Sequence, residues 1–453
     1  MSHYIKNISA KGVHGRFDIS QTFQPGINIL FGKNGMGKTT MLHILANILN
    51  ADFRRFAHLN FDCVEVNLDD GTSIYLERRS VQDDEAITLW MNKKKTLVGR
   101  VKEIKRQDAS LNDPYNNDSI NTYLEVDTSQ PLLSTAYFPA FRTMIEAWAS
   151  LEMEAEQNTP HWLRPAARRT DSQRVKTTLF ARQLFEQFVP FINFPTPTEI
   201  EKSLTDEIQS ALLSLAQLDR EMLAQAFVQI LEALSSKAPE QESSPDNIIA
   251  EIKALSVSLE KTPLSASSVE DSGIFILLPK LVHSLRIKSD INRIAVPILN
   301  VFRDLLRERV QRQEEGFESI KRYIDSVNEF LDDKQLEART PVEVRGSYIR
   351  SNDSLIELEH KNGSTTTGLQ VLSSGERQII TLIYAATHMS SQQVVLIDEP
   401  EISLHVDWQR MLLPKMSEQL GERQIIACTH SPIIGADYED RVMELQLTSA
   451  KTV

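Results

Sequence analysis

The segment from Gly32 to Thr39, GKNGMGKT, has the residue types and spacing of a phosphate-binding loop, G-x-x-x-x-G-K-[ST]. It follows the apolar run INILF and precedes TTMLHILANIL, so we expect a strand before it and a helix after it. In such a loop backbone N–H groups surround a phosphate, Lys38 reaches the terminal phosphates and the Thr39 hydroxyl is a ligand for Mg²⁺. The residues predicted to bind the nucleotide here are Gly32, Asn34, Gly35, Gly37, Lys38, Thr39 and Thr40.

Two carboxylates end a second apolar strand, in VVLIDEPE. Ligands of α/β sheets bind at the carboxyl ends of the strands, so Asp398 and Glu399 should face the phosphate loop. We predict that Asp398 supports Mg²⁺ and that Glu399 polarises the attacking water. A third apolar strand, in IIACTHSP, ends at His430, which is placed to hydrogen-bond the γ-phosphate and the water. A structural role is the alternative for each of these side chains, and the order of the motifs favours the catalytic one.

The stretch VLSSGERQII, residues 371–380, raises a separate question. A Ser-Ser-Gly step before Glu376 and Arg377 predicts the start of a helix. Such a start offers backbone N–H groups and hydroxyl groups to something anionic.

The motifs GKNGMGKT, LSSGERQ, VVLIDEPE and THSP occur in an order that resembles the ATP-binding-cassette (ABC) ATPases, specifically the soluble branch with Rad50, SMC, RecF and the OLD-type ATPases. The resemblance implies that LSSGERQ is the signature, in which Ser373 and Gly375, with Glu376 beside them, contact the γ-phosphate of ATP bound to a second protomer. The segment from Glu401 to His405 would line the seam between the protomers. The implied cofactors are ATP and Mg²⁺, and the implied partner is a second copy in a head-to-tail dimer or a higher oligomer.

Two features depart from that branch. The Gln that the family carries after its first β-rich lobe is not evident; residues 134–143, STAYFPAFRT, are the candidate segment, and Arg142 is its candidate polar group, so this position stays unassigned. A CxxC zinc hook is absent. The phrases YFPAFR, LSSGERQ and IDEPEISLH resemble the stand-alone ATPases of bacterial anti-phage systems, such as PtuA of Septu and AriA of PARIS. This resemblance implies a sensor or switch with a separately encoded effector, which we expect to be a nuclease. The alternative is a DNA-engaging repair or recombination ATPase of the RecF or SMC kind.

Strands and helices alternate at both ends of the chain, whereas the middle shows helical periodicity with almost no strand signal. Together with the resemblance, this pattern predicts an α/β fold. Residues 1–144 and 336–453 would form the two parts of an ABC-ATPase head, with a mixed-sheet lobe and a RecA-like parallel sheet. Residues 145–335 would form a large α-helical insertion.

The last helix of this insertion has the most regular pattern. Its apolar residues follow three- and four-residue steps at Val310, Phe317, Ile320, Ile324, Val327 and Leu331. A short coiled-coil arm is one interpretation. An amphipathic helix packed on its neighbours is favoured, because the pattern is short and Gln313 interrupts it.

Composition limits the remaining possibilities. The formal net charge of -13 argues against a surface that coats nucleic acid generally, although the basic segments 92–106 and 164–176 could follow a nucleic-acid backbone if they are more than solvated faces. Cys63 and Cys428 are the only cysteines, which excludes a disulfide framework and a cysteine zinc site. The start of the chain lacks the apolar stretch of a secretion signal, and no apolar run is long enough to cross a bilayer. We therefore expect a cytoplasmic protein.

Overall fold

The structure is a computed structural model that describes residues 3–81, 84–105, 131–142, 144–145, 170–235, 245–261, 292–338, 354–360, 363, 365–389 and 391–449. The chain divides into two compact units. The first combines Met1–Thr196 with Ser373–Val453, and the second is Pro197–Leu372. Each is described by itself below. The three-part division at residues 144 and 335 stays a prediction.

An antiparallel sheet forms one part of the first unit. Its order among the described residues is β15-β2-β1-β4-β5-β6-β7. The bounds are β1 Ile5–Val13, β2 Phe17–Thr22, β4 Cys63–Leu68, β5 Ser73–Val81, β6 Asp84–Met91, β7 Lys94–Arg100 and β15 Gln446–Ser449. Buried and half-buried residues alternate along β4, because successive side chains of a strand point to opposite faces. One face of this sheet therefore contributes to the core.

A parallel sheet forms the other part of the first unit, in the order β14-β3-β13-β12-β8. The bounds are β3 Ile27–Phe31, β8 Thr135–Phe138, β12 Val394–Asp398, β13 Gln424–Thr429 and β14 Val442–Glu444. Every residue of β8, β12 and β13 is buried, as is typical of a parallel sheet covered on both faces. The predicted α/β fold with a parallel sheet is confirmed, and the lobe predicted as a mixed sheet is antiparallel in all its described strand pairs.

The core of the first unit is built around helix α1, Lys38–Leu49. Its apolar side chains pack in one cluster with residues of β1, β4 and β5 and with Leu396, Ile426 and Cys428 of the parallel sheet. The helix that follows the phosphate loop is therefore held by both sheets. The other described helices of this unit are α4 Thr170–Leu184, α9 Ser374–Thr387 and α10 Val406–Leu420, with short 3-10 turns at Phe53–His58 and Glu439–Arg441.

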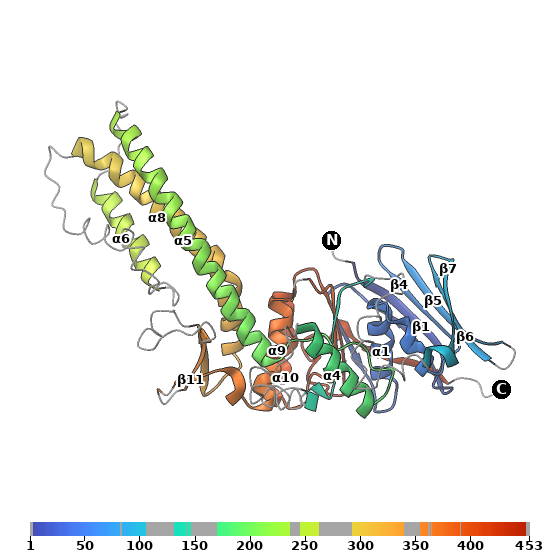
Figure 1. Cartoon of the computed structure of the whole chain (residues 1–453). Coiled ribbons are helices and arrows are strands. Elements are labelled where there is room, and N and C mark those ends of the chain that lie inside the picture. Colours follow the sequence, from blue (N-terminus) through green and yellow to red (C-terminus); the bar gives the residue numbers. More distant parts are fainter. Residues whose placement is uncertain are drawn as a thin grey trace, which may run out of the picture. The chain divides into compact units, whose positions relative to one another are not determined.

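The second unit consists mainly of helices α5 Pro197–Ser235, α6 Pro245–Lys261 and α8 Asn292–Asn328. Helices α5 and α8 run side by side in opposite directions (Figure 1), since Asp219 meets Arg309 and Glu207 meets Ser319. An apolar cluster joins α6 to both of them. The described part of this unit also contains a small sheet in the order β11-β10-β9, followed by a 3-10 turn at Leu369–Val371. The bounds are β9 Lys334–Ala338, β10 Ile356–His360 and β11 Thr365–Thr367.

Gln313 does not interrupt the buried stripe of α8 but belongs to it. Its side chain is buried together with Phe317, Ile320 and Tyr323, and it accepts a hydrogen bond from Arg309. Among the described residues, no helix is both long enough and apolar enough to cross a membrane.

Candidate active site

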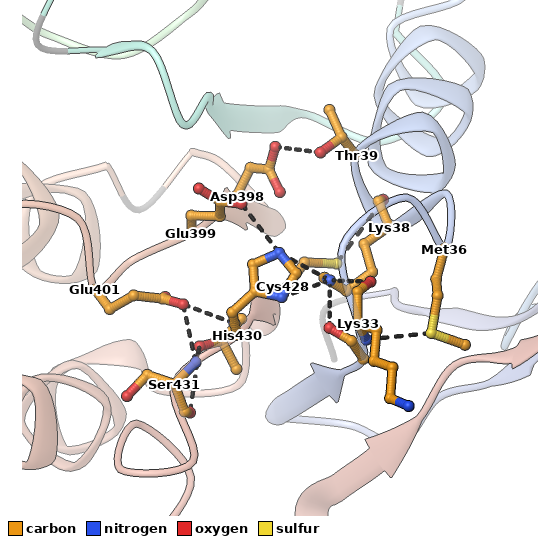
Figure 2. Close-up of polar contacts among 12 residues, drawn as sticks. Lys33, Met36, Lys38, Thr39, Asp398, Glu399, Glu401, Cys428, His430 and Ser431 are labelled. Atoms are coloured by element: carbon orange, nitrogen blue, oxygen red, sulfur yellow. Dashed lines mark hydrogen bonds and ion pairs between the residues drawn. The ribbon is translucent and has the colours of Figure 1, made fainter.

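The register of the parallel sheet brings three of the sequence motifs to one edge. Asp398, the last residue of β12, pairs with Cys428 of β13, and Thr429 at the end of β13 pairs with Phe31 of β3. The phosphate loop follows Phe31, Glu399 follows Asp398 and His430 follows Thr429. The predicted catalytic residues therefore leave the sheet at the same level, on neighbouring strands (Figure 2).

The phosphate loop turns into α1 at Gly37, whose φ of 76° lies in the left-handed region that glycine tolerates. A Cβ atom at this position would also lie 2.6 Å from the Phe17 ring, so the loop depends on glycine for two reasons. The Lys38 ammonium donates to the carbonyl oxygens of Gly32 at 2.6 Å and Lys33 at 3.2 Å. Burial lowers the pKa of Lys38, against the attraction of the nearby acidic groups. The Lys38 ammonium therefore contacts the backbone of the same loop that would bind a phosphate.

Thr39 and Asp398 form the predicted Mg²⁺ site. The Thr39 hydroxyl donates to Asp398 Oδ2 at 2.7 Å (Figure 2). The Asp398 side chain is buried, and within the part of the chain that the structure describes its Oδ1 atom has no hydrogen-bond partner. Burial raises the pKa of Asp398 to about 6, and a divalent cation beside Oδ1 would favour the charged form. One carboxylate and one hydroxyl fit Mg²⁺, which takes few protein ligands and completes its shell with phosphate oxygens and water.

Glu399 and His430 lie together beside Lys38. Glu399 Oε1 is 3.2 Å from His430 Nε2, and the Lys38 ammonium is 3.1 Å from each ring nitrogen of His430 (Figure 2). The carboxylate, the imidazole and the ammonium therefore form one connected group next to the Thr39–Asp398 pair. Such a group can orient a water molecule and hold its proton while it attacks a phosphate.

Glu401 supports His430, a role that the sequence did not suggest. Its Oε1 atom accepts hydrogen bonds from the backbone N–H groups of His430, at 2.6 Å, and Ser431, at 3.0 Å. The resemblance implies only a place for Glu401 at the seam between protomers. A carboxylate two residues after Glu399 is the only signal that the sequence offers, and the backbone partner cannot be read from it.

The predicted signature residues begin helix α9. Ser373 and Glu376 form a capping box, in which Ser373 Oγ accepts from the Glu376 N–H at 3.3 Å and Glu376 Oε2 accepts from the Ser373 N–H at 2.6 Å. At Gly375 a Cβ atom would lie 2.5 Å from the Ser403 carbonyl oxygen, so the helix start and the loop after Glu399 touch through backbone. The Ser373 side chain is exposed.

The remaining predicted residues lie around the loop. Asn34 and Gly35 are exposed at its tip, and Thr40 Oγ1 is 3.2 Å from His14 Nε2. Arg142, the candidate for the unassigned Gln position, is buried and donates to backbone carbonyl groups, including those of Asp398 and Glu399. A side chain engaged in this way does not fill the role of the family's Gln, so that position stays unassigned.

Comparison with known proteins identifies the family. The model of the AAA ATPase domain family matches residues 5–434, which is nearly the whole chain. The chain belongs to this family of ATPases. The match covers the phosphate loop, the Asp398–Glu399 pair and the strands of the two sheets other than β14 and β15. It confirms the prediction of an ABC-type ATPase made from the motifs and their order.

Three individual proteins are also similar. The Retron Vc95 probable ATPase of Vibrio cholerae serotype O1 biovar El Tor is 26% identical over 190 residues, which are 42% of this ATPase and 34% of that protein. The Smc head domain of Pyrococcus furiosus, solved with the C-terminal domain of ScpA, aligns with 99% of this chain and 96% of its own at 15% identity and a TM-score of 0.36. The recombination mediator RecF aligns over 98% of both chains at 12% identity and a TM-score of 0.34.

Proposed function

We propose that this ATPase is an ATP-gated switch, in which two copies close head to tail over bound ATP and separate after hydrolysis. The observation that carries the proposal is that the connected group of Lys38, Glu399 and His430 faces the phosphate loop while Ser373 stays exposed at the start of α9. The first set suits hydrolysis. The exposed hydroxyl and the helix N-terminus suit the γ-phosphate of a second copy's nucleotide.

The chain's own residues would divide the work as follows. Lys38 neutralises phosphate charge, Glu399 orients and polarises the water, and His430 hydrogen-bonds to both groups near the γ-phosphate. Thr39 and Asp398 would hold Mg²⁺, which supplies charge neutralisation at the phosphate oxygens when it is bound. Glu401 keeps His430 in place through the two backbone N–H groups.

Glu399→Gln tests the switch. This change removes the group that polarises the water and leaves Lys38, Thr39 and Asp398 intact, so ATP should bind and the closed dimer should accumulate. Light scattering after addition of ATP and Mg²⁺ should show a dimer fraction well above that of the wild type. Lys38→Ala is the matched control, because it removes the phosphate contact and should stay monomeric. Equal dimer fractions for Glu399→Gln and the wild type would contradict the proposal.

We further propose that the switch controls a separately encoded effector, of nuclease type, in an anti-phage system. The resemblance to the stand-alone ATPases of such systems and the likeness to a retron ATPase support this role. Co-expression with the neighbouring gene tests it. The effector should co-purify with the wild type, and ATP should change the amount retained in Glu399→Gln more than in Lys38→Ala. A neighbour that never binds, in any nucleotide state, would exclude it.

The competing function, a DNA-engaging repair ATPase, is favoured by one feature of the first unit. Lys93, Lys94 and Lys95 are exposed where β6 turns into β7. Of the other basic segment, only residues 170–176 lie within the described structure, in α4. If the hairpin binds a DNA backbone, replacing its three lysines by Glu should weaken duplex binding and flatten its salt dependence. Binding that is unaffected by these changes would remove this support.

A further inference from the structure

The backbone at Glu399 has an unfavourable conformation. Its φ is 47°, in the left-handed region that costs a non-glycine residue about 1 kcal/mol or more. Pro400 follows directly, and a proline ring normally drives the residue before it toward extended conformations. Glu399, the residue proposed to polarise the water, therefore has a backbone conformation that local sequence disfavours. Contacts with neighbouring residues must therefore offset the free-energy cost of this backbone conformation.

Arg142 makes contacts at both peptide groups that flank this residue. Its Nη1 atom donates to the Asp398 carbonyl at 3.0 Å, and its Nη2 atom donates to the Glu399 carbonyl at 3.1 Å. The same Nη1 atom donates to the Pro139 carbonyl at 2.9 Å, which ties the guanidinium to its own turn after β8. A planar guanidinium presents its donors in a fixed fork, so it can fix two successive carbonyl groups in one relative orientation.

The burial of Arg142 is the second observation. The residue is 1% exposed, although a guanidinium loses strongly favourable hydration when it leaves water. The loop that carries it follows β8, which pairs directly with β12 as far as Phe138 and Ile397. The fork therefore approaches the end of β12 from the neighbouring strand, just where the chain turns into Glu399. Three other contacts hold this turn, and each fixes a single group. The Glu399 N–H donates to the Cys428 carbonyl, the Ile402 N–H donates to the Glu399 carbonyl, and the Gln378 amide donates to the Pro400 carbonyl.

We infer that Arg142 is a positioning residue that holds the Glu399 backbone in its left-handed conformation and thereby aims the carboxylate at the attacking water. The inference rests on the proposed role of Glu399. Arg142 acts through the backbone in this role, because its Nη1 and Nη2 atoms donate to carbonyl oxygens.

The variants Arg142→Lys and Arg142→Gln test the inference. Lysine keeps the charge but cannot span two carbonyl groups, and glutamine loses both. We expect kcat to fall at least tenfold for each, while the Kd of a fluorescent ATP analogue changes less than about threefold. If Arg142→Gln does not fold, Arg142→Lys carries the test. Wild-type kcat in a folded Arg142→Lys protein would overturn the inference.

Two double variants separate positioning from general stability. In the Glu399→Gln background, where no carboxylate remains to be aimed, Arg142→Lys should change the residual hydrolysis less than about twofold. Pro400→Ala relaxes the restriction on residue 399, so adding it to Arg142→Lys should recover part of the lost kcat. Arg142 would be merely structural under two joint results. Arg142→Lys would lower kcat by the same factor with and without Glu399→Gln, and Pro400→Ala would restore no kcat to Arg142→Lys.

Arg423 provides the matched control. It is also a buried arginine that donates to backbone carbonyl groups, and it lies near the C-terminal ends of α9 and α10. Its partners are the carbonyl groups of Ala385, Ala386, Met389 and Leu420. Arg423→Lys should lower the thermal midpoint and change kcat less than about threefold. Failure of the inference also differs from failure of the proposed function. If Glu399→Gln hydrolyses ATP like the wild type, the proposed role of Glu399 and the positioning role of Arg142 are both wrong. If Glu399→Gln is inactive while Arg142→Lys is fully active, only the positioning role of Arg142 is wrong.

Discussion

His43 is a titratable side chain in the fully buried part of α1, where its Nε2 atom lies 2.8 Å from the Tyr137 hydroxyl. Burial lowers its pKa to about 3, from an ordinary value of 6.5. The imidazole is therefore mostly neutral in the folded protein above a pH of about 3. The unfolded chain binds a proton at this residue below pH 6.5, so acid favours unfolding.

We predict that the first unit loses stability through His43 as the pH falls below 6.5. The loss should reach about 2 kcal/mol at pH 5 and continue toward the folded pKa of about 3. None of the four tryptophans lies in the sequence of the second unit, Pro197–Leu372, and Trp90 and Trp408 are described residues of the first. Tryptophan fluorescence during urea unfolding therefore follows the first unit. His43→Gln keeps a polar group beside Tyr137 but cannot titrate, and its stability should fall less steeply over this range. Parallel pH profiles for the two proteins would contradict the prediction.

Among the individual residues, the sequence predicted those that belong to a contiguous motif or end an apolar strand. Lys38, Thr39, Asp398, Glu399 and His430 were found in this way, because strand ends of a parallel sheet meet at one edge. Their catalytic roles stay predictions. The contacts of Arg142 and Glu401 could not be predicted from the sequence, because each side chain bonds to backbone groups of a segment distant along the chain. Nothing in the residue type of either one reports which carbonyl or N–H group it will meet.

At the scale of whole elements, α5 and α8 are joined by a largely buried ion pair. Arg309 forms an ion pair with Asp219 and donates to Gln313, and the Asp219 side chain is 8% exposed. A buried polar contact tolerates few alternative alignments, because a shift of either helix would leave a charge without its partner. This contact therefore fixes the register of α5 against α8. Helical periodicity predicted α8 but could not identify its partner or the role of Gln313.

Asp219→Ala should lower the stability of the helical unit by about 2 kcal/mol or more, because it leaves the Arg309 charge poorly compensated. The exposed pair Glu318–Arg322 on the same helix is the control, with side chains 65% and 51% exposed. Glu318→Ala should cost less than about 1 kcal/mol. Far-UV circular dichroism during thermal unfolding measures both. Equal midpoint shifts for the two variants would show that the buried pair contributes nothing special.

At the scale of the whole molecule, the proposed closure places Ser373 of one copy on the ATP of the other. Lys38→Ala and Ser373→Arg should each be inactive alone, the first without its phosphate contact and the second with a bulky cation at the seam. A mixed dimer contains one site with an intact phosphate loop and an intact signature, so mixing should restore part of the activity. Two affinity tags verify the mixed dimers, and phosphate release and ATP-dependent closure are then measured.

The wild-type chain with the same tags is the control for this experiment. If verified mixed dimers neither hydrolyse ATP nor close, whereas tagged wild-type dimers do both, Ser373 does not act on the other copy's nucleotide. Closure without hydrolysis would instead indicate that both sites must be intact for turnover while supporting the placement of Ser373.

The order of strands in the parallel sheet also determines when the first unit can form during synthesis. Strand β3 ends at Phe31 and β8 at Phe138, but β13 and β12, which lie between them in the sheet, come only after residue 393. At the usual 5–20 residues per second, the ribosome needs roughly 20 to 80 s to pass from β3 to β13. During that time the nascent chain carries apolar strands whose neighbours do not yet exist. From this topology we expect chaperones to bind the nascent chain before its release. We also expect that the first unit cannot form when translation stops before β13.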